Sequence, residues 1–147
     1  MRSGFLDKAC GTDEDLRYTV ESLLAGQSLA AMIAAHPLTV EKAVLVAIGV
    51  AVEIDFLHGD GIVHGQIHPE NIMVCPEGRV RLLHFETGAR NPDRDIKALG
   101  SMLSEITSGM NAPKRLREIA RKATRPQDRY AGAGDMQRDL ENLLSQL

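Results

Sequence analysis

Residues 64–71 bring together several polar side chains that could take part in acid–base or ligand chemistry. The segment contains His64, His68 and Asn71, and an apolar stretch follows it. Imidazole is the most frequent general acid or base of enzymes. Gln66 lies at the centre of the segment, and an amide has no useful basicity. Gln66 therefore offers a polar contact but cannot take a proton from a substrate hydroxyl.

The composition indicates one globular domain with an aliphatic core. The chain has 147 residues, of which 44% are apolar and 3% aromatic, with no tryptophan. This length is sufficient for one domain with a real core. The net charge of −3 gives no reason to expect nucleic acid or an anionic membrane as a partner. The longest apolar stretch, residues 43–52, is too short for a bilayer span, which needs about 20 residues, so we expect no membrane insertion.

The cysteines and the N-terminal residues favour a cytoplasmic protein. Cys10 and Cys75 lie far apart and have no metal-ligand spacing, so we expect reduced thiols. The first residues contain no long apolar stretch of the kind found in a signal peptide.

The chain pattern predicts a mainly helical α+β fold with one small β-hairpin. We expect a strand over residues 16–21 and a short helix after Ser28. Thr39 should begin a long helix over residues 39–57, since a segment of about eighteen residues without turn signals exceeds the usual strand length of about 3–10. This helix is apolar nearly all round, so it should be buried or form an interface.

The sequence pattern of the second half of the chain predicts the hairpin and three further helices. Residues 72–75 and 79–83 flank a turn and should pair. The helices should begin after Asn91, after Pro113 and at about Asp135. We expect the following positions of these helices to face the core: Ile96, Leu99, Leu103, Ile106, Leu116, Ile119, Ala120, Ala123, Met136, Leu140, Leu143, Leu144 and Leu147.

Residues 64–71 resemble the catalytic loop of protein kinases, whose pattern is H-R-D-[LI]-K-P-E-N. Residues 82–86 stand where that family has a strand ending in D-F-G. Residues 95–100 resemble its central helix, and residues 125–130 resemble its closing P-x-x-R segment. The positions of the catalytic-loop frame that the chain keeps are His64, Ile67, Pro69, Glu70 and Asn71.

The resemblance implies the C-terminal lobe of a bacterial-type Ser/Thr kinase over residues 16–147, preceded by an N-terminal segment, residues 1–15. So short a segment cannot supply the Gly-rich loop and lysine of a kinase N-lobe. Only nine residues separate Phe85 from Asp95, which leaves no room for an activation segment. We therefore expect a truncated lobe, although a separate polypeptide could supply the missing one.

The resemblance also implies that the positions that carry kinase catalysis are replaced. The catalytic base position holds Gln66, the lysine position holds His68, and the metal-binding aspartate of D-F-G is His84. Asn71 keeps the identity of the second metal ligand, but one amide cannot hold Mg²⁺. We therefore expect a pseudokinase with no catalytic residue, no bound metal and no cofactor.

Two charged residues match structural positions of the family. Asp95 corresponds to the helix aspartate that accepts backbone hydrogen bonds from the catalytic loop, which makes it an expected anchor. Arg129 corresponds to the arginine that pairs with an A-P-E glutamate. Because that motif is missing here, Arg129 must meet another carboxylate, water or a binding partner.

A group of histidines and a run of basic residues can each be interpreted as structural or as functional. His64, His68 and His84 could bind Zn²⁺ if the fold brings them together, but we favour a packed His64 with two exposed histidines. Residues 114–129 contain seven basic and two acidic side chains, a local charge of +5. That run could bind an acidic or phosphorylated partner, but we favour a solvated helix face.

The expected function is a non-catalytic interaction module, a scaffold, adaptor or regulator that binds another protein or forms a homodimer. Val46 and Val50 of the apolar helix, with Arg129, are the candidate interface residues. The alternative is a degenerate nucleotide-binding sensor or a residual kinase-like transferase, since residues 18–21, which resemble the hinge strand of kinases, could accept an adenine ring.

Overall fold

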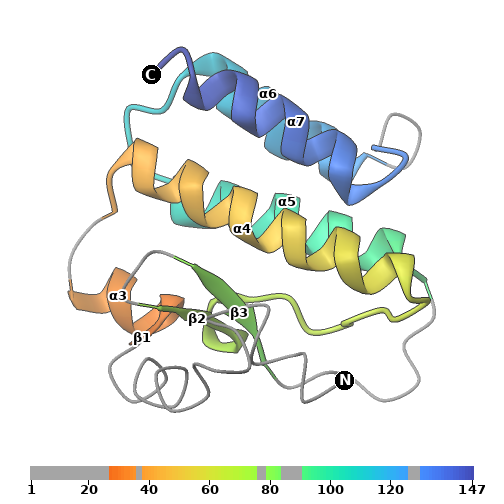
Figure 1. Ribbon diagram of the computed structural model, residues 1–147. Helices are drawn as coiled ribbons and strands as arrows, with labels where there is room; N and C mark the ends of the chain where they lie inside the picture. The colour runs from red at the N-terminus through yellow and green to blue at the C-terminus, as the bar shows by residue number, and fades with distance from the viewer. Residues whose placement is uncertain (1–26, 36–37, 76–78, 84–90, 126–129) are drawn as a thin grey trace.

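The computed structural model describes residues 27–35, 38–75, 79–83, 91–125 and 130–147. The helix α4 lies at the centre, with α6 and α7 on one side and a small sheet with α3 on the other (Figure 1). In chain order the elements are β1 (Gln27–Ser28), α3 (Leu29–Ala35), α4 (Val40–Gly59), a 3₁₀ turn (Pro69–Asn71), β2 (Ile72–Val74), β3 (Val80–Leu82), α5 (Asp93–Ile106), α6 (Lys114–Thr124) and α7 (Ala133–Leu144).

The predicted mainly helical α+β class is confirmed, and the hairpin is part of a larger sheet. Strands β2 and β3 pair antiparallel, with Ile72 opposite Leu82. The two-residue strand β1 adds to β2, with Gln27 opposite Val74, so the sheet has the order β1-β2-β3. The strand predicted over residues 16–21 lies outside the described residues.

Local signals set the ends of the helices, as the sequence predicts. The hydroxyl of Thr39 accepts a hydrogen bond from the backbone N–H of Lys42 at 3.1 Å, at the start of α4. The side chain of Asn91 accepts one from the N–H of Asp93 at 3.0 Å, before α5. Gly109 follows α5 with φ of 84°, a conformation that glycine adopts without steric cost.

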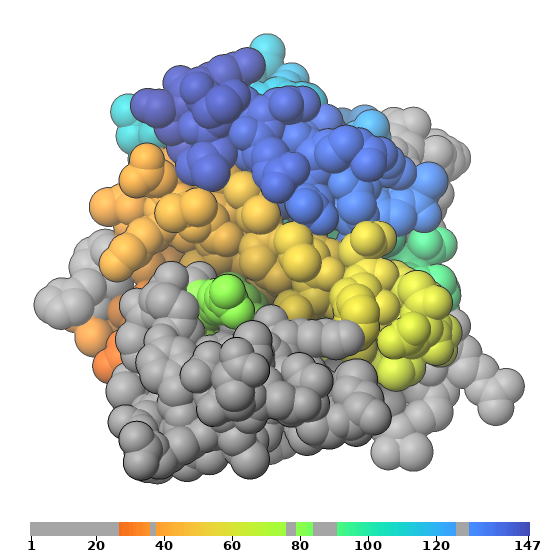
Figure 2. Space-filling model, viewed as in Figure 1, coloured from red at the N-terminus to blue at the C-terminus, as the bar shows by residue number. Residues whose placement is uncertain are grey.

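Helix α4 is buried on most of its circumference, because α5, α7 and β3 pack against it. Val46 and Val50 are 5% and 0% exposed, so they belong to the core, and the prediction that they form an interface is wrong. In Figure 2, part of the surface of α4 is visible beside α7. Its exposed large apolar side chains are Leu45 at 47%, Val52 at 42% and Phe56 at 41%.

Two further expectations are corrected. Leu147, expected to face the core, is 50% exposed, because α7 ends at Leu144. Cys75 takes part in a disulfide bond, which overturns the expectation of a reduced thiol at this position; its partner lies outside the described residues. None of the helices in the described ranges is both long enough and apolar enough to cross a membrane.

Candidate functional site

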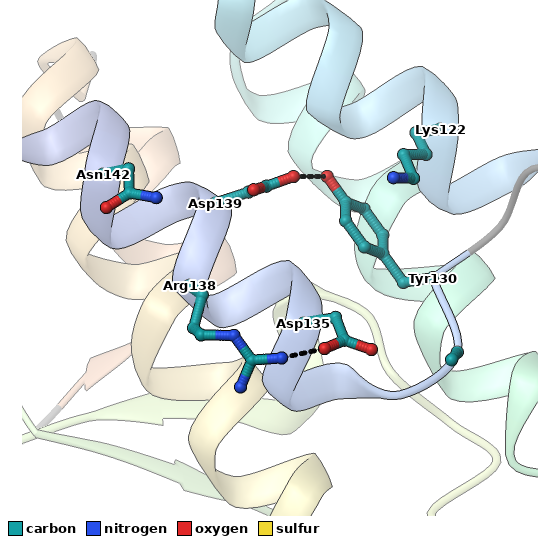
Figure 3. Close-up of a pocket in the computed structure, with 7 residues that line it drawn as sticks. Lys122, Tyr130, Asp135, Arg138, Asp139 and Asn142 are labelled. Atoms are coloured by element: carbon teal, nitrogen blue, oxygen red, sulfur yellow. Dashed lines mark hydrogen bonds and ion pairs between the residues drawn. The ribbon is translucent and has the colours of Figure 1, made fainter.

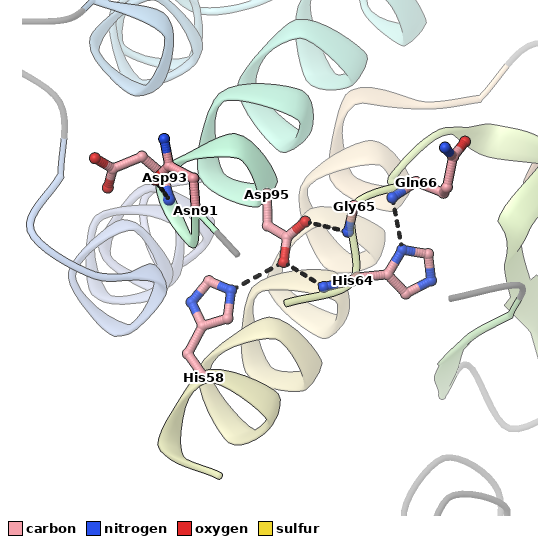
Figure 4. A network of polar contacts seen from close by, with 7 residues as sticks. All are labelled: His58, His64, Gly65, Gln66, Asn91, Asp93 and Asp95. Atoms are coloured by element: carbon pink, nitrogen blue, oxygen red, sulfur yellow. Dashed lines mark hydrogen bonds and ion pairs between the residues drawn. The ribbon is translucent and has the colours of Figure 1, made fainter. Parts of the chain in front are cut away.

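The carboxylate of Asp95 anchors the segment that resembles a catalytic loop. Asp95 lies in the first turn of α5 and is fully buried. Its Oδ2 accepts the backbone N–H of His64 at 2.8 Å, and its Oδ1 accepts that of Gly65 at 2.8 Å. Figure 4 shows a third contact, in which Nε2 of His58 lies 2.9 Å from Oδ2. The structure thus places Asp95 where the resemblance implies an anchor.

Both ring nitrogens of the His64 imidazole form hydrogen bonds within the chain. The side chain is fully buried. Its Nδ1 accepts the backbone N–H of Gln66 at 3.0 Å, and its Nε2 lies 2.8 Å from the carbonyl oxygen of Leu83. Since a carbonyl only accepts, we assign the proton to Nε2, which gives a neutral ring. His64 therefore holds the loop against the end of the sheet and presents no lone pair to a metal ion.

Asn71 forms hydrogen bonds to other residues of the same loop. Its side-chain N–H₂ donates to the carbonyl oxygen of Gln66 at 2.8 Å and lies 3.0 Å from Nε2 of His68. Its backbone carbonyl oxygen accepts the backbone N–H of Leu83 at 2.8 Å. Asn71 is buried, so its amide nitrogen is committed to the loop. The side-chain amide of Gln66 points away from Asp95 (Figure 4).

Two of the residues singled out in the sequence, His84 and Arg129, lie outside the described residues. The arrangement of His64, His68 and His84 is therefore not described. Among the residues that the structure describes, no group of three or more histidine, cysteine, aspartate or glutamate side chains could hold a metal ion.

The structure also brings together residues that the sequence did not pair. His58 lies in the last turn of α4 and contacts Asp95, which is 37 positions away in the sequence. A local spacing pattern cannot predict a pair at this separation. Arg81 of β3 is buried. Burial lowers the pKa of Arg81, and the negative charge of Glu53 on α4 acts in the opposite direction.

A second polar cluster joins α6 to α7. The hydroxyl of Tyr130 donates to Oδ2 of Asp139 at 2.7 Å, and Nη2 of Arg115 lies 3.3 Å from the same oxygen. Nζ of Lys122 lies 4.5 Å from the centre of the Tyr130 ring, a cation–π distance. Burial, then the hydrogen bond to Asp139, raises the pKa of Tyr130.

This cluster borders a cavity of about 370 Å³ in which the charges pair with one another. Figure 3 shows Arg138 turned toward Asp135 and Asp139 turned toward Tyr130. With these pairs formed, the cavity has little uncompensated charge for a ligand. The residues that line it are Lys122, Tyr130, Ala131, Asp135, Arg138, Asp139 and Asn142.

Part of the chain is similar to serine/threonine protein kinases. A probable serine/threonine-protein kinase of Clostridium perfringens is 34% identical over 76 residues, which are 51% of this chain and 11% of that protein. The greatwall kinase of Xenopus tropicalis is 33% identical over 76 residues, or 51% of this chain and 8% of the relative. The mouse greatwall kinase is 32% identical over 65 residues, or 44% of this chain and 7% of the relative.

The chain thus spans about a tenth or less of the length of these curated relatives. No family model matches it. The similarity supports a kinase-like relationship over about half of the chain.

Proposed function

We propose that this chain is a non-catalytic interaction module with a kinase-related fold, a pseudokinase that works by binding proteins. The observation that carries the proposal is Gln66 at the position that the resemblance gives to the catalytic base. Kinases use an aspartate there to orient the substrate hydroxyl and accept its proton. The amide of Gln66 cannot accept that proton.

The hydrogen bonds of the loop support a structural role for its remaining polar groups. The carboxylate of Asp95 is buried and receives three N–H groups, so it is not available as a substitute base. Both ring nitrogens of His64 are hydrogen-bonded within the chain. In this proposal the two buried polar residues of the segment that match the kinase pattern, His64 and Asn71, serve the fold.

An exposed apolar stripe on α4 supports the binding half of the proposal. Leu45, Val52 and Phe56 are each more than 40% exposed. Residues seven and eleven positions apart fall within about 20° of the first on a helix of 3.6 residues per turn. These three side chains thus form one stripe, which we call the α4 stripe. Its occupant in this proposal is another protein or a second copy of the chain.

The absence of catalysis is tested by nucleotide binding. We expect no heat of binding when ATP with Mg²⁺ or Mn²⁺ is titrated into the protein to millimolar concentration. Metal-dependent binding that Asn71→Ala abolishes, while the variant keeps its fold by circular dichroism, would contradict the proposal and favour the nucleotide-sensor alternative.

The α4 stripe is tested by Leu45→Glu and Phe56→Glu, with Ser101→Glu on an exposed part of α5 as the matched control. Molar mass from light scattering reports a second copy, and capture on immobilised protein reports another partner. We expect both stripe variants to lose the association that the wild type and Ser101→Glu retain. An association that survives both changes in folded protein would show that this stripe is not the interface.

A further inference from the structure

We propose that a groove between α5 and α6 is an anion site that binds a phosphate group. The groove has a volume of about 360 Å³ and lies apart from the α4 stripe, so the proposal does not depend on the function proposed above. We call it the α5–α6 groove. Its lining residues are Ser104, Thr107, Ser108, Gly109, Met110, Ala112, Arg117, Ala120, Arg121 and Thr124.

The charge of the groove comes from two arginines on one face of α6. Arg117 and Arg121 are four residues apart, so their side chains lie next to each other on the helix. None of the described residues that line the groove is an aspartate or a glutamate. Among the described residues, neither guanidinium takes part in an ion pair. Nη1 of Arg117 donates to the carbonyl oxygen of Ala112 at 2.7 Å, which holds this side chain in place.

The basic side chains on the other side of α6, toward α7, contact other residues of the chain. Arg115 pairs with Asp139, and Lys122 lies over the ring of Tyr130. In the neighbouring cavity, Arg138 pairs with Asp135 (Figure 3). The cations toward α7 thus have partners within the chain, whereas the two arginines toward α5 line a groove to which no described residue contributes a carboxylate.

Helix α5 and the turn that follows it supply hydroxyl groups to the groove. Ser104 and Ser108 lie one turn apart, line the groove and are exposed, so their hydroxyls can donate to an anion. The hydroxyl of Thr107 already donates to the carbonyl oxygen of Leu103 at 2.7 Å. That bond reduces the negative potential that the carbonyl end of α5 would present to an anion.

The close packing of α5 on α6 fixes the hydroxyls relative to the arginines. A Cβ atom on Gly100 would lie 2.6 Å from Cβ of Ala123 and 2.8 Å from the carbonyl oxygen of Ala120. The two helices are therefore in direct backbone contact, and the groove beside this contact is preformed. A preformed site saves the ordering cost of binding.

Two guanidinium groups and two hydroxyls match the chemistry of a phosphate group. Such a group carries a charge of about −1.5 to −2 at neutral pH and three acceptor oxygens. Arginine binds phosphate with two parallel hydrogen bonds, which adds directional selectivity. The ligand is a free phosphate or the phosphorylated side chain of a peptide, which share this chemistry.

The test titrates inorganic phosphate and a short phosphoserine peptide into the full chain at constant ionic strength, with binding followed by amide chemical shifts. We expect saturable shifts at groove residues. We expect Arg121→Gln to weaken binding at least tenfold, and Arg117→Gln to weaken it as well. Arg138→Gln is the matched control, since it removes the same charge beside the other cavity and should change affinity less than twofold. Thermal unfolding verifies that each variant is folded.

The outcomes separate the two sources of phosphate. Tighter binding of the phosphopeptide than of phosphate assigns the groove to a phosphorylated partner, and equal binding assigns it to free phosphate. The proposal is overturned if shifts at the groove do not saturate, if Arg121→Gln binds like the wild type, or if the unphosphorylated peptide binds as tightly as the phosphopeptide.

Discussion

Nε2 of His58 lies 2.9 Å from Oδ2 of Asp95, so the last turn of α4 is joined to the first turn of α5. The carboxylate that receives this contact also holds two backbone N–H groups of the loop over residues 64–71. One buried carboxylate thus connects two core helices and the segment that resembles a kinase catalytic loop.

The first prediction concerns this carboxylate. We expect Asp95→Asn to lower the free energy of unfolding by about 3 kcal/mol, because an amide replaces a charged acceptor and turns N–H groups toward buried donors. Urea unfolding measures the change. Asp60→Asn, at an exposed position, is the control and should have little effect. Equal stability of Asp95→Asn and the wild type would show that the carboxylate does not anchor the loop.

The second prediction concerns the contact between His58 and Asp95. We expect His58→Ala to cost about 1–2 kcal/mol, since it removes a donor from a buried carboxylate. His58→Gln keeps a donor and should recover part of the loss in urea unfolding. His68→Ala, at a half-exposed histidine, serves for comparison. If His58→Ala and His68→Ala unfold at the same urea concentration, the contact between His58 and Asp95 does not contribute more to stability than a half-exposed histidine does.

The third prediction tests the close approach of α5 and α6. Gly100→Ala places a methyl group 2.6 Å from Cβ of Ala123, and the helices must separate to accept it. We expect a loss of about 2–3 kcal/mol, typical of overpacking. At Gly59 nothing lies within 4 Å of an added Cβ, so Gly59→Ala should be neutral or stabilising. Thermal melts of the two variants should differ in this direction, and a reversed order would refute the packing argument.

The fourth prediction concerns the pH dependence of stability at Tyr130. Burial and the bond to Asp139 raise the pKa of Tyr130 in the folded chain, whereas the unfolded value is about 10. The folded state therefore holds the proton more tightly, and this stabilisation is complete below pH 10 and lost as the pH rises toward the folded pKa.

The measurement is urea unfolding across the alkaline range. We expect the wild type to lose stability above about pH 10 more steeply than Tyr130→Phe, which has no hydroxyl to ionise. The comparison removes the contribution of lysines, which both proteins share. Parallel curves for the two proteins would show that the Tyr130 hydroxyl does not contribute.

The sequence by itself determined the helices, because their signals are local. Thr39 and Asn91 hydrogen-bond to N–H groups within three residues. Gly109 follows the end of α5 in a left-handed conformation. The role of Asp95 followed from a resemblance in which residues separated by about thirty positions keep their order.

Tertiary structure alone decided which side of α4 reaches the surface. This helix is apolar nearly all round, so periodicity does not distinguish a core face from an open one. Val46 and Val50 are buried because α5, α7 and β3 pack around α4, whereas Leu45 and Phe56 remain exposed.

The same reason applies to the long-range polar contacts. The pairing of His58 with Asp95 depends on how helices pack across the core. The packing of α5 on α6 likewise brings Arg117 and Arg121 to the same groove as Ser104 and Ser108. A spacing in the sequence specifies neighbours on one helix. The register between two helices is set only when their side chains interlock.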